Sequence, residues 1–216
     1  MAFMNVPATA PVRGLVLRST HARLYDIGSW LLLRGRSKWY RRRLLELAGV
    51  QPGSRVLDVG CGTGSLVIAA SRGGAAAVSG VDASPEMLDI AGRKAKRAGV
   101  ETTFRLASAE ALPSADTSFD FVFNTIMLHH LPQPARVQCA REMRRVLKAD
   151  GRLLVVEFDA PSSLEGHGSL GRVRRHGGHG HVPADEVARV LREAGLTVLQ
   201  SGLVGVRDLH YTLARP

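Results

Sequence analysis

The sequence contains little cysteine, few acidic residues and no long apolar segment, and these absences narrow the class of protein. Two cysteines, Cys61 and Cys139, are too few for a metal cage or a disulfide scaffold, which favours a reducing, cytoplasmic compartment. No apolar run approaches the ~20 residues that a bilayer-spanning helix needs, so an integral membrane protein is excluded. The N-terminus lacks the basic start, apolar stretch and cleavage site of a secretory signal, which also indicates the cytoplasm.

Acidic residues are outnumbered by basic ones, 19 against 29, which gives a net charge of +10. Such a surface attracts phosphates, and nucleic acid and anionic lipid both qualify as partners. With 216 residues, 45% hydrophobic and 22% charged, the chain has the composition of a globular protein with a packed core. Its length fits one compact domain.

Short apolar runs alternate with amphipathic stretches from residue 55 onward, a pattern typical of an α/β fold with a parallel sheet between helices. The expected strands are residues 55–59, 77–82, 102–106, 119–124 and 152–158. The expected helices are residues 65–70, 85–98, 136–147 and 183–194. Two final apolar runs, residues 196–203 and 209–213, predict an antiparallel edge hairpin. The sheet would then have seven strands, mostly parallel, with helices on both faces.

Two segments differ from this alternating pattern. Residues 1–50 are expected to form an N-terminal helical segment that covers the active site, and residues 51–216 are expected to form the core. Within the core, residues 159–182 are rich in Gly, Ser, His and Arg and poor in apolar side chains, which predicts a mobile lid. Its histidines could bind a metal by composition alone, but no carboxylate or cysteine spacing supports a defined site, so no metal is expected.

The most informative segment is the strand at residues 55–59, which runs directly into a turn with glycines at 60, 62 and 64. Glycine lets a ligand approach the backbone at the carboxyl end of a strand, where open α/β sheets bind ligands. Asp82, 24 residues beyond Asp58, can reach the same crevice and accept hydrogen bonds from a ribose diol. Ser65 replaces the third glycine of the dinucleotide fingerprint, and a Walker lysine is missing. The segment predicts a different nucleoside site, with a tight turn that binds nothing as the alternative.

Five motifs in order resemble the class I S-adenosylmethionine-dependent methyltransferases, in particular the small-molecule branch that includes the ubiquinone and menaquinone C-methyltransferases. The resemblance extends over about residues 22–213. Its motifs lie at residues 58–64 (DVGCGTG), 80–88 (GVDASPEML), 109–113 (AEALP), 118–120 (SFD) and 145–148 (RVLK). The resemblance implies a Rossmann-like fold and S-adenosyl-L-methionine as the cofactor.

The resemblance assigns roles at the methionine and ribose end of this cofactor. Gly60 and Gly62 would cradle the methionine portion, and Asp82 would hold the ribose hydroxyls. Asp58 would steady the loop and the cofactor's amino group. Tyr25 lies in a Tyr-Asp segment that, in the family, closes over the methionine end; the alternative is a tyrosine that packs between helices.

At the adenine end, Ala83 and Met87 would flank the base. Ser108 stands where the family usually has an aspartate that contacts the adenine amino group, so a hydroxyl or backbone contact must replace that carboxylate. The complete set implied to contact the cofactor is Tyr25, Asp58, Gly60, Cys61, Gly62, Asp82, Ala83, Met87, Ser108, Ala109, Asn124 and Thr125.

Two adjacent histidines, His129 and His130, follow the fourth strand, where the family's chains pass over the sulfonium and begin the substrate pocket. An imidazole with an ordinary pKa of about 6.5 can remove a phenol or hydroxyl proton at neutral pH, so both are candidate catalytic bases. The alternative is that they pack against the cofactor and that catalysis is alignment of the acceptor alone.

Residues 30–43 carry six Lys and Arg, no acid and three aromatic residues. This composition suits peripheral contact with an anionic membrane, and the alternative is an ordinary helix that packs its apolar residues on the core. Nucleic acid is not expected as a partner, because no RNA-reading module is visible.

The sequence therefore predicts methyl transfer from S-adenosylmethionine to a small, hydrophobic acceptor such as a quinone precursor, an aromatic metabolite or a lipid. An RNA methyltransferase and a non-catalytic cofactor-binding module are the alternatives left open.

Overall fold

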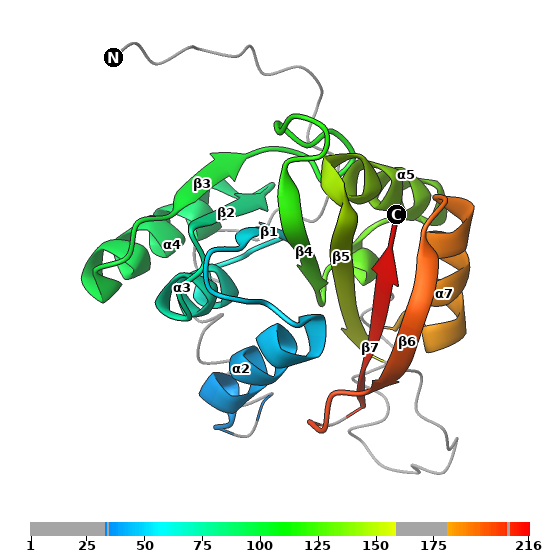
Figure 1. Ribbon diagram of the computed structural model, residues 1–216, viewed down its shortest axis with the longest axis horizontal. Helices are drawn as coiled ribbons and strands as arrows, with labels where there is room; N and C mark the ends of the chain where they lie inside the picture. The colour runs from blue at the N-terminus through cyan, green and yellow to red at the C-terminus, as the bar shows by residue number, and fades with distance from the viewer. Residues whose placement is uncertain (1–32, 34, 159–180, 207) are drawn as a thin grey trace.

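The structure is a computed structural model that describes residues 33, 35–158, 181–206 and 208–216. It contains a seven-stranded sheet in the order β3-β2-β1-β4-β5-β7-β6 (Figure 1). The strands are β1 (Arg55–Val59), β2 (Ala77–Asp82), β3 (Thr103–Leu106), β4 (Phe119–Thr125), β5 (Leu147–Phe158), β6 (Thr197–Leu203) and β7 (Leu209–Arg215). The helices are α2 (Ser37–Ala48), α3 (Ser65–Arg72), α4 (Pro85–Ala98), the 3-10 helix η1 (Leu128–His130), α5 (Gln133–Val146) and α7 (Ala184–Glu193).

Strands β1 to β5 pair in parallel, whereas β7 pairs antiparallel with both β5 and β6. This confirms the predicted mostly parallel sheet with an antiparallel hairpin at one edge. The hairpin joins the sheet through β7, which leaves β6 as the outer strand. The strand order reverses between β1 and β4, and such a switch point opens a crevice at the carboxyl ends of the strands.

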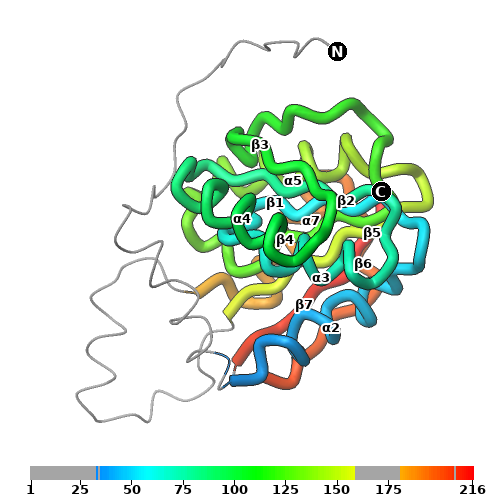
Figure 2. The backbone as a smooth tube through the Cα atoms, turned by 90° about the vertical axis from the view of Figure 1, so that its left-hand side faces the viewer, coloured from blue at the N-terminus to red at the C-terminus, as the bar shows by residue number. Residues whose placement is uncertain are grey.

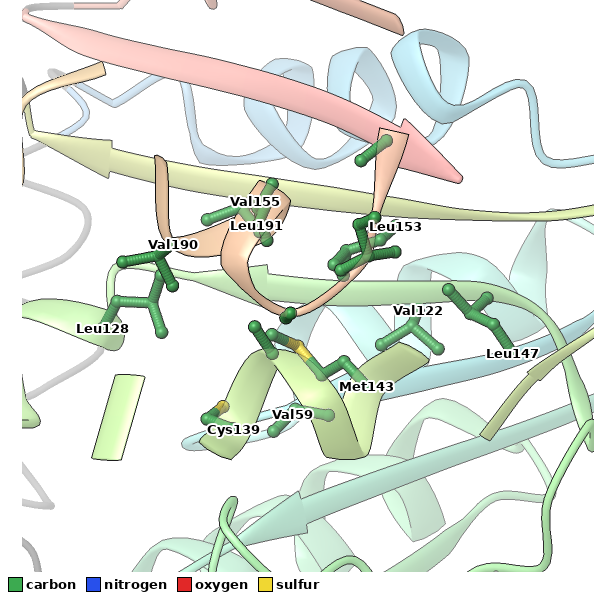
Figure 3. Close-up of a cluster of buried hydrophobic side chains, with 14 of the residues drawn as sticks. Val59, Val122, Leu128, Cys139, Met143, Leu147, Leu153, Val155, Val190 and Leu191 are labelled. Atoms are coloured by element: carbon green, nitrogen blue, oxygen red, sulfur yellow. The ribbon is translucent and has the colours of Figure 1, made fainter. Parts of the chain in front are cut away.

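Helices cover both faces of the sheet, as predicted. Helices α2 and α3 pack over a cluster that includes Leu44, Val67 and Phe123, and in Figure 2 α2 lies beside β7. Helices α5 and α7 cover the opposite face, where Met143 and Leu191 belong to the second cluster (Figure 3). Because both faces are buried, the central strands are apolar nearly throughout.

The predicted first residues of α5 and β5, the helix and the strand that follow β4, are each wrong by a few residues. Helix α5 begins at Gln133 rather than at residue 136, because a proline in its first turn is compatible with helix initiation. Strand β5 begins at Leu147 rather than at residue 152. Phe119 pairs with Leu147 and Phe121 pairs with Arg152, so the four residues between those partners loop out of the pairing.

Several predictions concern residues outside the described ranges. Of the N-terminal segment 1–50 the structure describes mainly α2, and of the lid 159–182 it describes only residues 181 and 182. Tyr25 also lies outside the described residues. In the described ranges, no helix is both long and apolar enough to cross a bilayer.

Candidate cofactor and active site

The turn after β1 has a backbone conformation that favours glycine. Gly60, Gly62 and Gly64 have φ angles of 77°, 51° and 72°, all in the left-handed region. The N–H groups of residues 60 and 61 donate to the carbonyl of Val81 at 2.8 and 3.0 Å, which anchors the turn to β2. A Cβ on Gly60 would lie 2.6 Å from Cγ of Met127. The glycine turn is therefore in direct contact with the loop that follows β4.

Asp82, at the carboxyl end of β2, meets the glycine turn as predicted. Its Oδ2 accepts a hydrogen bond from the Gly62 N–H at 2.7 Å, and its Oδ1 accepts one from the Ser84 N–H at 2.9 Å. Burial raises the pKa of Asp82, and these backbone N–H groups oppose the rise. The bonds orient the carboxylate while each oxygen keeps a lone pair that can accept from a ribose hydroxyl.

Asp58, in β1, is a buried carboxylate beside Asp82. It is 2% exposed, and its Oδ1 has no hydrogen-bond partner in the part of the chain that the structure describes. Burial, reinforced by the negative charge of Asp82, raises the pKa of Asp58 to about 7. Because a buried carboxylate without a donor is costly, a cationic group at this position would be strongly favoured.

The two carboxylates fit the polar groups of S-adenosylmethionine. A cationic amino group would meet Asp58, and a ribose diol would meet Asp82. Both residues flank the glycine turn, which presents backbone rather than side chains to a ligand. The donors of the cofactor therefore match the acceptors that the chain offers.

If Asp58 holds the amino group, affinity for S-adenosylhomocysteine should rise from pH 5 to pH 7 and then level off. Below its pKa of about 7, Asp58 must lose a proton before it can pair with a cation, which costs up to about tenfold in affinity per pH unit. Calorimetric titration across this range measures the slope. An Asp58→Asn variant should bind more weakly with a flatter profile, and a wild-type affinity that is independent of pH would remove Asp58 from the site.

Two further residues assigned to the cofactor, Cys61 and Asn124, are buried. Asn124 donates from Nδ2 to the Val59 carbonyl at 2.9 Å, which ties β4 to β1, and its Oδ1 has no partner among the described residues. Burial raises the pKa of the Cys61 thiol, so it stays protonated at neutral pH and is no nucleophile. Thr125 is half-buried next to Asn124. Of these residues, Asn124 offers a ligand the clearest polar contact, its free amide oxygen.

The loop expected to contact adenine contains an acid that the sequence analysis missed. The Ser108 hydroxyl accepts from the Glu110 N–H at 3.2 Å and donates to Glu110 Oε2 at 3.3 Å. The hydroxyl expected to replace the family's aspartate is thus engaged with Glu110, which brings a carboxylate back to this loop. Ala83 and Ala109 are half-buried, and Met87, in the first turn of α4, is buried.

The loop after β4 is held by Glu157, a fully buried carboxylate near the end of β5. Its Oε1 accepts from the N–H of Met127 at 2.8 Å and from that of Leu128 at 2.6 Å. Its Oε2 lies 2.8 Å from Nδ1 of His129. Because a carboxylate only accepts hydrogen bonds, we assign the imidazole proton to Nδ1, which leaves the Nε2 lone pair of the neutral ring as a base.

The two candidate histidines differ in their surroundings. His129 is 8% exposed and is oriented by Glu157. The ring of His130 lies against it, with 3.9 Å between centroids, and is half-buried. Phe158 adds an edge contact to His129 at 6.5 Å. The contact with Glu157 favours His129 over His130 as the proton acceptor.

The backbone of the same loop is strained. Ile126 has a φ of 55°, which costs a β-branched residue roughly 1–3 kcal/mol. Its N–H donates to the Val156 carbonyl at 2.7 Å, and the turn that it makes leads the next two N–H groups to Glu157. Arg136 fixes the far end by donating from Nε to the Leu128 carbonyl at 3.1 Å. A strained backbone conformation that several hydrogen bonds maintain is typical of functional sites.

Residues 56–151 match the family described as "Methyltransferase domain". The chain is 36% identical over 135 residues to the ubiquinone/menaquinone biosynthesis C-methyltransferase UbiE of Bdellovibrio bacteriovorus, covering 62% of this chain and 57% of that protein. It is 38% identical over 153 residues to the demethylmenaquinone methyltransferase of Tropheryma whipplei, with 71% and 61% covered. It is 36% identical over 159 residues to the 27-O-demethylrifamycin SV methyltransferase of Amycolatopsis mediterranei, with 70% and 58% covered. The matches thus span less than two thirds of these relatives.

Solved structures agree with the sequence matches at the level of the fold. A SAM-dependent methyltransferase from Aquifex aeolicus superimposes with a TM-score of 0.72 at 22% identity, covering 92% of this chain and 98% of that one. The sequence matches, the shared fold and a glycine turn flanked by two acids point to the same family. The chain therefore belongs to the class I S-adenosylmethionine-dependent methyltransferases and is similar to the ubiquinone/menaquinone C-methyltransferases.

Proposed function

We propose that the protein transfers a methyl group from S-adenosylmethionine to a hydrophobic small molecule that carries an ionisable hydroxyl, such as a phenol or hydroquinol. The observation that carries this proposal is the contact between Glu157 and His129, in a loop that packs on the glycine turn. It supplies a positioned base next to the region where the family's cofactor lies.

The names of the relatives support a small-molecule acceptor. One is a C-methyltransferase of ubiquinone/menaquinone biosynthesis, and another methylates an oxygen of a demethylrifamycin. Removal of a hydroxyl proton serves both outcomes, because a phenolate is nucleophilic at its oxygen and at the ring carbons ortho and para to it. Methylation at such a carbon is completed when that carbon loses its hydrogen as a proton. A base in this position is therefore compatible with either kind of methylation.

When bound, the cofactor supplies a methyl group on a positively charged sulfur, which a nucleophile can displace in line. Asp58 would hold the cofactor's amino group, and Asp82 would hold its ribose. Nε2 of His129 removes the acceptor's hydroxyl proton, and the carboxylate of Glu157 stabilises the imidazolium that results. The remaining requirement is alignment of acceptor and methyl group in a site that excludes water.

Mass spectrometry with a methyl-deuterated cofactor tests this proposal. The purified protein is incubated with an organic-soluble cell extract, an aqueous extract and total RNA in separate reactions. We expect the label in a component of the organic extract. Heat-treated protein serves as the control for transfer that does not depend on the enzyme.

Two outcomes would contradict the proposal. Label in RNA would identify an RNA methyltransferase. Calorimetric binding of the cofactor without transfer to any fraction would identify a non-catalytic binding module.

A further inference from the structure

One surface of the protein combines exposed cations with exposed apolar side chains. It consists of the beginning of α2, the end of β6 and the turn between β6 and β7, and Figures 1 and 2 both place α2 beside this hairpin. Leu203 ends β6 and pairs with His210, so its side chain lies on the face of the sheet opposite α2, and the surface extends across the end of the sheet. A Cβ on Gly205, in the turn, would lie 3.2 Å from the ring of Trp39, so the helix and the turn are in contact. We call this surface the hairpin face; its residues are Arg36, Lys38, Trp39, Arg42 and Leu203.

The apolar residues of the hairpin face lie outside the two buried core clusters. Trp39 is 38% exposed and Leu203 is 68% exposed. Tyr40 and Leu44 fill the buried side of α2, which leaves Trp39 turned outward. Residues 30–43, the basic and aromatic run of the sequence, therefore do not all face the same way. Leu33 and Tyr40 belong to the core, whereas Trp39 does not. Trp39 remains as an aromatic residue that a partner can cover.

The face carries more cations than acids. Arg36, Lys38 and Arg42 are exposed, and the first turn of α2 contains no acidic residue. The guanidinium carbon of Arg36 lies 4.3 Å from the centroid of the Trp39 ring, so a cation and an aromatic ring are presented together. Two exposed acids are nearby in sequence, Glu46, which pairs with Arg42 at 2.8 Å, and Asp208 in the hairpin turn.

These cations weaken the helix on which they lie. The beginning of a helix carries partial positive charge, which favours acidic side chains, whereas α2 has Arg36 and Lys38 there. An anionic surface outside the protein would offset the repulsion.

The face lies at the same edge of the sheet as the candidate active site. Leu203 pairs with His210, which also pairs with Glu157 on the neighbouring strand. Helix α2 also begins at this edge, because Trp39 contacts the hairpin turn. A flat anionic surface against the hairpin face would therefore lie next to the carboxyl ends of the strands.

We propose that the hairpin face binds the surface of an anionic lipid bilayer. Trp39 and Leu203 enter the headgroup region, and Arg36, Lys38 and Arg42 attract the lipid phosphates. The further idea that the methyl acceptor arrives from this bilayer rests on the proposed function, whereas membrane binding itself does not. A bilayer fits better than RNA because the exposed leucine offers nothing to a phosphate backbone.

Vesicle sedimentation tests the face without any methyl acceptor. The full chain is mixed with phosphatidylcholine vesicles and with vesicles containing phosphatidylglycerol. We expect binding to the anionic vesicles that decreases with salt, because exposed charges are screened within about 8–10 Å. Lys38→Glu should weaken that binding roughly 25-fold, since each cation near such a surface contributes roughly fivefold. Leu203→Ser should weaken it roughly fivefold.

Matched variants separate this face from general charge and hydrophobicity. Lys96→Glu makes the same charge change at an exposed position of α4, and Leu199→Ser changes an exposed leucine within β6. Both should bind the anionic vesicles like the wild type. Equal effects of Lys38→Glu and Lys96→Glu, equal binding to neutral vesicles, or binding of RNA but not vesicles would each overturn the proposal.

Discussion

Replacement of Glu157 by glutamine should lower kcat for methyl transfer by roughly 10²–10⁴ and leave cofactor affinity within about twofold. The amide oxygen can still accept the N–H groups of Met127 and Leu128, so the loop should keep its conformation. The amide NH₂, however, donates to Nδ1 of His129 and forces the imidazole proton onto Nε2. Single-turnover assays with the acceptor found by isotope labelling measure the loss, and calorimetry measures cofactor binding.

Three controls make this result specific. His129→Gln should cause a similar loss, and the double variant should lose little more than either single variant, because the two residues act as a unit. Both losses should shrink at high pH, where the acceptor ionises in solution. Glu193→Gln, which removes an exposed carboxylate from α7, should change nothing. Reduced cofactor affinity with an unchanged kcat would contradict the role of Glu157 and assign this loop to cofactor binding.

Replacement of Asp82 by alanine should weaken binding of S-adenosylhomocysteine by roughly 30- to 1,000-fold. Loss of two charge-assisted hydrogen bonds to the ribose costs roughly 2–4 kcal/mol. The variant also leaves the Gly62 N–H without the oxygen that accepts it at 2.7 Å, so the glycine turn loses an anchor. Calorimetry measures the affinity, and circular dichroism checks that the protein remains folded.

Asp89→Ala is the matched control for Asp82→Ala. Asp89 is an exposed acid of α4 that pairs with Arg93, and its loss should not change cofactor affinity. An Asp82→Ala protein that is folded and binds the ligand as tightly as the wild type would place the ribose elsewhere.

The sheet and the glycine turn could be predicted from the sequence because their signals are local. Alternating apolar runs indicated the strands, and the glycines at 60, 62 and 64 occupy positions with positive φ. The approach of Asp82 to this turn followed from the rule that parallel strands present their carboxyl ends at one edge. The boundary of β5 was missed because its irregular pairing with β4 depends on a partner strand rather than on local pattern.

The positioning of His129 could not be predicted, because it depends on contacts between distant segments. Glu157 lies in the run Leu153–Phe158, where a single acid among apolar residues was interpreted simply as part of a strand. Its partners at 127–129 are 28 to 30 residues away. A charged residue within a buried strand was nevertheless a usable signal, since buried carboxylates require partners. The positive φ of Ile126 had no signal at all, because β-branched residues disfavour it.

The most direct test of this account is a crystal structure of the protein with S-adenosylhomocysteine. We expect the ribose hydroxyls to contact Asp82, the amino group to lie within hydrogen-bond distance of Asp58 Oδ1, and the sulfur to face the loop containing His129. An ordered ligand whose ribose lies away from Asp82, or whose sulfur points away from His129, would contradict it.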